Sequence, residues 1–160
     1  MIQASGCCFL SLDTGRIMLQ QRSKNSSHPL KWSFWGGKAE RKERPVETLL
    51  RECKEELGVS LLGSKPLLNL SLIYIPPSNF LVNPFVGFSK ERIQFIPDPK
   101  EVTEVLEVPF SLFLHNKVLQ EVAVGARGKT FHVPAYVVDN HVIWGATAMI
   151  LSELKETLKL

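Results

Sequence analysis

The chain of 160 residues has few cysteines, no long apolar run and no block of basic residues. Its three cysteines, Cys7, Cys8 and Cys53, are an odd number, and none stands in a CxxC or Cys/His spacing typical of zinc sites. Reduced thiols in a cytoplasmic compartment are therefore favoured over a disulfide framework. No window reaches the roughly 18 uninterrupted apolar residues that a membrane-spanning helix needs, so we expect no membrane partner.

The charge is only mildly positive, with 19 Lys and Arg against 16 Asp and Glu, a formal net charge of +3. These basic residues are scattered along the chain, whereas proteins that track a nucleic-acid backbone cluster them. The beginning of the sequence also lacks the basic region and cleavage site of a signal peptide. We therefore expect a cytoplasmic protein that does not bind nucleic acid.

Short β-prone segments separated by turn residues predict a sheet with many strands. We expect strands at residues 2–12, 17–22, 32–35, 67–75, 80–88, 93–96, 102–108, 118–124 and 130–138. Pro84 should weaken the fifth of these or place it at a sheet edge. Helices are predicted at residues 45–57 and 143–159, and a short helix or turn at 109–114. With no repeat and no linker, the pattern indicates one α/β (α+β) domain over residues 1–160, a mixed sheet flanked by helices.

The segment from Pro45 to Gly58 combines helix signals with a high density of carboxylates. Pro45 suits the first helical turn, and Gly58 suits the left-handed residue that ends a helix. Its apolar residues recur at spacings of three and four, at Val46, Leu49, Leu50, Cys53 and Leu57. Glu52, Glu55 and Glu56 stand at i, i+3 and i+4, so their side chains converge on a neighbouring face. Such a trio is either a site for a hard divalent cation or a solvated surface face.

The residues around this helix resemble the signature of the Nudix hydrolase family. That signature is a glycine, five residues, a glutamate, seven residues and then Arg-Glu-x-x-Glu-Glu-x-Gly. Its positions are occupied here by Gly37, Glu43, Arg51, Glu52, Glu55, Glu56 and Gly58, with Val59 at the closing aliphatic position. Cys53 replaces the usual aliphatic residue and is expected to pack as a small hydrophobe. The resemblance implies that residues 37–59 are a Nudix box, a loop-helix-loop laid against a mixed sheet.

By the same resemblance, the chain is an enzyme that cleaves a diphosphate bond in a nucleoside diphosphate linked to another group. Glu52, Glu55 and Glu56 would carry Mg²⁺ or Mn²⁺, with the carbonyl of Gly36 as an additional ligand. Arg51 would orient Glu43 by a charge-assisted hydrogen bond, the alternative being an ordinary surface ion pair.

The identity of the general base stays open, because it varies within the family. Glu52 is the first choice, and Glu101 or Glu104 on a later loop is the second. Either later glutamate can instead ligate a metal ion or face solvent.

Several residues beside the box are candidates for contacts with the substrate, which we expect to be a small-molecule nucleotide. Trp32, Phe34 and Trp35 precede the glycine turn and either stack on a nucleobase or belong to the core. Arg22 and Lys38 are candidate phosphate contacts. The sequence leaves open whether one chain or a homodimer is the working unit.

A second resemblance covers residues 101–110, EVTEVLEVPF, and residues 143–148, IWGATA. Both look like segments common in the coenzyme A diphosphatase branch of the family. That branch has Phe-Pro-Gly-Gly before the box, where this chain has Phe34-Trp35-Gly36-Gly37, and the predicted loop at residues 23–31 does not reproduce the preceding pattern. Coenzyme A is therefore one candidate substrate beside ADP-ribose, other nucleoside diphosphate derivatives and nucleoside triphosphates. The alternative to hydrolysis is a nucleotide-binding or regulatory module of the same fold.

Overall fold

The computed structural model describes residues 1–26, 30–58, 67–90 and 92–159. Its strands and helices follow in the order β1 (Ile2–Ser11), β2 (Arg16–Arg22), β3 (Trp32–Ser33), β4 (Trp35–Lys38), α1 (Pro45–Leu57), β5 (Leu67–Asn69), β6 (Ile73–Ile75), β7 (Phe80–Ser89), β8 (Val102–Pro109), the 3-10 helices η1 (Phe110–Leu114) and η2 (Asn116–Val118), β9 (Leu119–Ala126), β10 (Lys129–Val138), β11 (His141–Trp144) and α2 (Ala146–Leu158).

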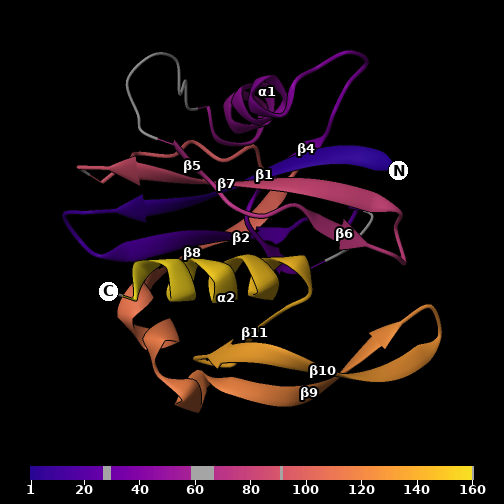
Figure 1. Cartoon of the computed structure of the whole chain (residues 1–160), viewed down its shortest axis with the longest axis vertical. Coiled ribbons are helices and arrows are strands. Elements are labelled where there is room, and N and C mark those ends of the chain that lie inside the picture. Colours follow the sequence, from indigo (N-terminus) through magenta and orange to yellow (C-terminus); the bar gives the residue numbers. More distant parts are fainter. Residues whose placement is uncertain (27–29, 59–66, 91, 160) are drawn as a thin grey trace.

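Strands β1 to β8 form one mixed sheet within the described residues. The order is β3-β2-β1-β7-β5, with β4 beside β1, β6 beside β7 and β8 beside β2. Strands β1 and β7 run parallel, and the other pairs in this sheet are antiparallel. Figure 1 shows α1 on one face of this sheet and α2 on the other. The predicted α+β arrangement of a mixed sheet between helices is confirmed.

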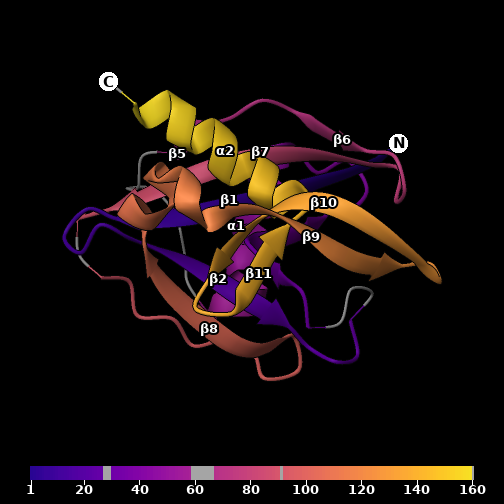
Figure 2. The same ribbon diagram turned by 90° about the horizontal axis from the view of Figure 1, so that it is seen from below.

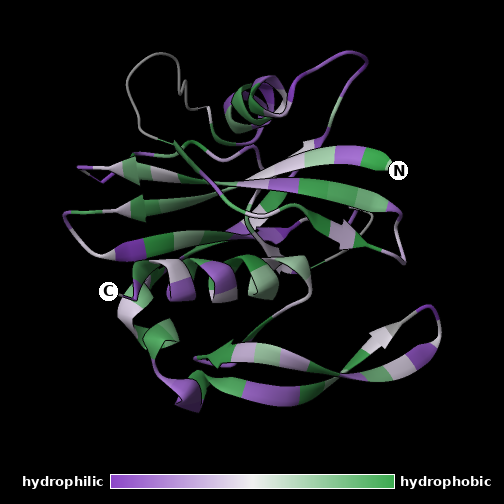
Figure 3. Ribbon diagram, viewed as in Figure 1, coloured by the Kyte–Doolittle hydropathy of each residue, from purple (hydrophilic) through white to green (hydrophobic). Residues whose placement is uncertain are grey.

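Alternating side chains of β1 serve the two faces of the sheet. Cys7 and Phe9 belong to the core beneath α1, whereas Cys8 and Leu10 belong to the core shared with α2. This follows from the period of two along a strand, which sends successive side chains to opposite faces. Figure 3 shows the apolar stretches of β7 and neighbouring strands in the layer between the helices. Cys7, Cys8 and Cys53 are all free and buried, as expected for reduced thiols.

A second sheet, β9-β10-β11, lies beyond α2 (Figures 1 and 2). The strands predicted at residues 118–124 and 130–138 are confirmed as the antiparallel pair β9 and β10, and Asp139 and Asn140 make the turn between β10 and β11 with positive φ. The predicted start of the last helix at residue 143 is wrong, because Ile143 pairs with Tyr136 in the sheet. Gly145, at φ +67°, then separates the strand from α2. None of the helices in the described ranges is long and apolar enough to cross a membrane.

The strand predicted at residues 93–96 is also wrong. This segment joins neither sheet, although Ile93 and Phe95 pack against the core beneath α1. The backbone N–H of Ile96 instead donates to the carbonyl of Leu57, and that of Asp98 donates to the carbonyl of Glu56. The segment therefore satisfies the free carbonyls at the carboxyl end of α1 rather than those of a strand.

The predicted strand at residues 67–75 is divided into β5 and β6, and Pro84 explains the gap between them. Strand β7 is internal, not an edge, with β1 on one side and both short strands on the other. β5 pairs with Phe85–Gly87 and β6 with Phe80–Val82. The interruption falls at Asn83 and Pro84, where proline has no N–H to donate.

Candidate active site

Helix α1 presents its acidic residues beside β4 because its apolar stripe is buried in the core. Leu49, Cys53 and Leu57 are fully buried and pack with β1 residues and Trp35. Arg44 precedes the predicted first residue, Pro45, and Gly58 ends the helix at φ +64°. The predicted helix and its boundaries are confirmed. Val59, the last residue of the predicted box, lies outside the described residues.

Two glycines of β4 allow the glutamates of α1 to approach the strand. Gly36 has φ +143°, and a Cβ on it would overlap the carbonyl oxygen of Ser5 in β1. A Cβ on Gly37 would overlap the carboxylate of Glu52. Gly36 is therefore required by the sheet, and Gly37 by the position of the Glu52 side chain.

Glu56 is a buried carboxylate, with only 5% of its surface exposed. It accepts a hydrogen bond of 2.9 Å from the backbone N–H of Gly36 and one of 3.4 Å from the side-chain amide of Gln20. Burial raises the pKa of Glu56 to about 7, although these two donors favour its charged form. A cation beside Glu56 would therefore offset a real desolvation cost.

Arg51 holds the other carboxylates of the box in place. Its guanidinium donates two hydrogen bonds to Glu43, at 2.8 and 3.0 Å, and reaches the carbonyl of Lys38 at 3.0 Å. Its Nη1 also donates to Glu52 at 2.8 Å and to Glu55 at 3.1 Å. The two bonds from Arg51 to Glu43, followed by a bond from the backbone N–H of Glu40, lower the pKa of Glu43 to about 2. The predicted Arg51–Glu43 contact is present, with a bidentate geometry that lysine could not reproduce.

Glu52 combines features of both neighbours, since it is partly buried like Glu56 and hydrogen-bonded to Arg51 like Glu43. Its side chain is 15% exposed, and burial raises its pKa more than the hydrogen bond from Arg51 lowers it. Glu55 is 59% exposed and shares Nη1 of Arg51 with Glu52. The three helix glutamates thus face the same space with graded exposure.

That space is an open cavity of about 440 Å³. It is lined by Arg22, Gly36, Gly37, Lys38, Glu52, Glu55, Glu56, Asp98 and Glu101. Of the predicted site residues, Arg51 and Glu43 support this wall from behind α1's glutamates rather than line it. Asp98 was not predicted, because the sequence around it indicates only a Pro-Asp-Pro turn; in the structure its N–H donates to the carbonyl of Glu56, which holds it beside the cavity.

Glu104 does not reach the cavity, contrary to its inclusion among the metal ligands. The pairing of β8 with β2 shifts by one residue between Gln21 and Arg22, which is a β-bulge. The shift puts Val102 on the α1 face together with Val105, and leaves Glu104 exposed on the face of Leu106. Glu101, before the bulge, is left facing the cavity.

The structure also corrects the suggested stacking of Trp32, Phe34 and Trp35 on a nucleobase. Their exposed fractions are 5%, 6% and 0%, so no ring face is offered to a ligand. Trp35 stacks on Phe95, with ring centroids 5.9 Å apart, and Trp32 contacts His141 edge to face. These three rings are core residues, the alternative that the sequence also allowed.

The donor atoms at the cavity suit a hard divalent cation, although they do not form a preassembled cage. Among the residues that the structure describes, no three His, Cys, Asp or Glu side chains are already grouped to hold a metal ion. Glu52 and Glu55 are engaged by Arg51, and Glu56 by Gly36. Carboxylate and carbonyl oxygens are nevertheless the ligands that Mg²⁺ and Mn²⁺ prefer. A cation bound beside Glu56 would offset the desolvation cost of its buried carboxylate, which favours binding.

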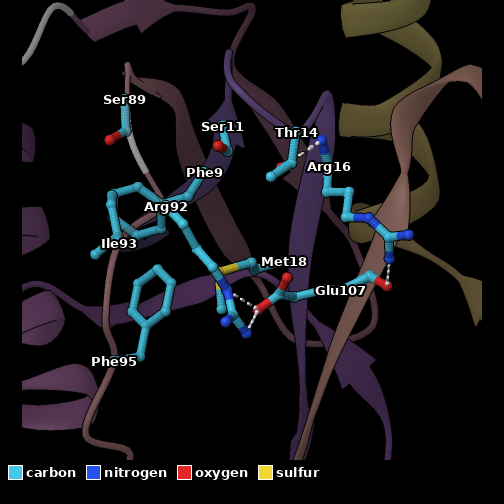
Figure 4. Close-up of a pocket in the computed structure, with 10 residues that line it drawn as sticks. All are labelled: Phe9, Ser11, Thr14, Arg16, Met18, Ser89, Arg92, Ile93, Phe95 and Glu107. Carbon is cyan, nitrogen blue, oxygen red and sulfur yellow. Dashed lines mark hydrogen bonds and ion pairs between the residues drawn. The ribbon is translucent and has the colours of Figure 1, made fainter.

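A second hollow, where the end of β1 pairs with the start of β2, is much smaller, at about 10 Å³ (Figure 4). Arg92 donates to Glu107 through Nε at 3.0 Å and Nη2 at 2.6 Å. Arg16 donates to the carbonyl of Glu107, and the rings of Phe9 and Phe95 line the opposite wall. Its charged groups are therefore matched by partners within the chain.

A family model described as the NUDIX domain matches residues 1–124. The chain belongs to the Nudix family. One relative, named Uncharacterized Nudix hydrolase NudL, from Photorhabdus laumondii, is 32% identical over 150 residues, covering 89% of this chain and 77% of that protein. Nudix hydrolase 22, chloroplastic, from Arabidopsis thaliana is 34% identical over 158 residues, which cover 90% of this chain and about half, 51%, of that protein.

Solved Nudix structures share the fold at low sequence identity. A MutT/nudix family protein from Enterococcus faecalis has a TM-score of 0.67 at 17% identity, covering 98% of this chain and 62% of that chain. The Nudix hydrolase RenU from M. smegmatis has a TM-score of 0.65 at 16% identity, covering 99% and 88%. These likenesses confirm the Nudix architecture, while the resemblance to the coenzyme A diphosphatase branch stays a prediction.

Proposed function

We propose that this Nudix-type hydrolase cleaves a diphosphate bond in a nucleoside diphosphate derivative, with Mg²⁺ or Mn²⁺ held by Glu52, Glu55, Glu56 and the carbonyl of Gly36. The observation that carries the proposal is the single cavity that these residues share. When bound, the metal supplies neutralisation of phosphate charge and activation of water. A family whose members are named hydrolases supports the reaction type.

Residues of the chain itself would contact the phosphates, position the glutamates and act as the general base. Arg22 and Lys38 line it with cationic groups that can contact phosphate oxygens. Arg51 keeps Glu52 and Glu55 in position and is itself fixed by Glu43. Because Glu52 is partly desolvated and at the cavity wall, we assign it as the general base, with Glu101 as the alternative.

The substrate is proposed to be a small-molecule nucleotide. Coenzyme A remains a candidate because of the segments at residues 101–110 and 143–148, beside ADP-ribose, other nucleoside diphosphate derivatives and nucleoside triphosphates. A cytoplasmic location, and the choice between one chain and a homodimer, remain predictions from the sequence.

A chromatographic screen over these compounds, in Mg²⁺ and in Mn²⁺, tests the proposal, because cleavage of the diphosphate bridge gives two phosphate esters that separate from the substrate. We expect metal-dependent turnover of at least one compound, and a loss of at least about a hundredfold in kcat for both Glu55→Gln and Glu56→Gln. Glu47→Gln is the matched control, since Glu47 lies on the same helix but pairs with Arg44. That variant should retain its activity.

Two outcomes would contradict the proposal. Full activity in Glu55→Gln and Glu56→Gln would remove the site assignment. Compounds that bind but are never cleaved with either metal would favour the nucleotide-binding or regulatory module instead.

A further inference from the structure

Two cationic residues, Arg22 of the cavity lining and Lys31, lie on neighbouring backbone segments that are hydrogen-bonded to each other. Strands β2 and β3 pair Gln21 with Trp32, and beyond that pair Arg22 stands against two residues, Leu30 and Lys31. The N–H of Arg22 donates to the carbonyl of Lys31 at 3.0 Å, and the N–H of Leu30 donates to the carbonyl of Arg22 at the same distance. Like charges directly across an antiparallel pair destabilise it. An anion that contacts both side chains would offset this repulsion.

The ammonium group of Lys31 is held in place by the second sheet. Its Nζ lies 4.1 Å from the ring centroid of Trp144 on β11. It also packs against Gly145, where an added Cβ would stand 2.9 Å from Nζ. Burial, and then the charge of Arg22, lower the pKa of Lys31. A half-buried lysine fixed in this way has already lost much of the mobility and hydration that surface lysines keep.

Arg22 is the link between this ammonium group and the acidic cavity. Its side chain lines the cavity, while its Nε is buried and finds no acceptor among the described residues. Within those residues, neither Arg22 nor Lys31 forms an ion pair with a carboxylate, whereas Arg44, Arg51 and Arg92 each do. A buried donor without a partner costs free energy that a ligand acceptor would recover.

We infer that Arg22 and Lys31 form a subsite for a phosphate monoester that the substrate carries in addition to the diphosphate that is cleaved. The inference rests on the proposed function, because it extends the same cavity. A monoester carries a charge of about −1.5 to −2 at pH 7, which matches two cations, whereas each internal phosphate of a diphosphate bridge carries about −1. Arg22 would contribute paired N–H donors, and Lys31 a point charge braced on Trp144.

Equilibrium titrations in EDTA test the subsite without turnover, so their outcome is independent of whether the enzyme cleaves anything. The probes are two matched pairs, coenzyme A against dephospho-coenzyme A and NADP⁺ against NAD⁺, each differing by one phosphate monoester. In wild type we expect the phosphorylated member of at least one pair to bind about tenfold tighter. Lys31→Met should abolish this preference, and Lys31→Arg, which keeps the charge and the contact with the ring, should retain it.

A purely structural brace between Lys31 and Trp144 makes a different prediction. It would lower the melting temperature of Lys31→Met and leave the preference between paired ligands as in wild type, which overturns the subsite. Wild-type protein that binds both members of each pair equally, or binds none of the four, also overturns it. So does a Lys31→Met variant that weakens both members by the same factor, since the two cations would then contact the shared diphosphate.

Discussion

The acidic cavity beside α1 and the small hollow at Glu107 both carry charged residues, but they balance them differently. In the hollow, Arg92 holds Glu107 with two hydrogen bonds, and the volume of about 10 Å³ has room for at most one water molecule. In the cavity of about 440 Å³, Glu56 is buried with a raised pKa, and the buried Nε of Arg22 has no acceptor in the described part of the chain.

The difference shows that the desolvated charged groups with incomplete partners lie in the cavity and not in the hollow. A paired surface charge contributes little to stability, and its hydrogen-bonding groups are already used by its partner, so it interacts only weakly with a ligand. A desolvated carboxylate or guanidinium with incomplete partners destabilises the empty protein and binds its counterion more tightly. This difference supports the proposal that the cavity binds the ligand and that the hollow is structural.

The strongest way to sharpen this comparison is to remove the buried charge with Glu56→Gln in metal-free protein. The pKa of Glu56 is about 7 in the folded protein, above its ordinary value of 4.5, so the folded state binds more protons between these pH values. Stability should therefore fall as pH rises from about 4.5 to 7, by at most about 3 kcal/mol. The variant should lack this loss and be more stable than wild type at pH 8, by urea denaturation in EDTA.

Adding a divalent metal ion should reverse the stability advantage of Glu56→Gln over wild type. Wild type needs the carboxylate for the proposed cation, so Mn²⁺ should raise its melting temperature and leave that of Glu56→Gln nearly unchanged. A variant less stable than wild type at pH 8 in EDTA would contradict the account of Glu56 as a destabilising buried charge.

The next test weakens the support of the cavity wall through Arg51→Lys. Lysine cannot keep both bonds to Glu43 while also reaching Glu52 and Glu55, so we expect kcat/KM to fall about 10- to 100-fold, or roughly 1.4–2.7 kcal/mol. Arg44→Lys is the matched control, because Arg44 also pairs with a glutamate of α1 but is 75% exposed. Equal losses in the two variants would contradict the positioning role of Arg51.

The parts of this site that the sequence predicts are those encoded by local spacing. Pro45, Gly58 and the apolar stripe specify α1, and the period of the helix then groups Glu52, Glu55 and Glu56 without reference to the rest of the chain. The contact of Arg51 with Glu43 is implied by the resemblance to the Nudix signature, in which both positions lie within one short segment.

The parts that sequence reasoning misses depend on partners far along the chain. Asp98 joins the cavity through the carbonyl of Glu56, and Trp35 is buried by stacking on Phe95. The apolar period of α2 extends back to Ile143, but pairing with Tyr136 places that residue in a strand. For Asp98 and Trp35 no window of neighbouring residues contains the deciding contact, whereas Ile143 is decided by a hairpin partner close in sequence, whose pairing overrides the helical period.

The smallest expected effect belongs to the hollow, where Arg92→Gln breaks the ion pair with Glu107. Arg92 is 68% exposed, so the loss of stability should be at most about 1 kcal/mol and should shrink as salt is added. Hydrolysis should remain within twofold of wild type, because neither residue lines the acidic cavity. Urea denaturation at low and high salt, together with kcat/KM on the best substrate, measures both quantities. A drop in activity of tenfold without loss of stability would show that the hollow also handles substrate, and the division between paired and unpaired charge would then fail as a guide to the active site.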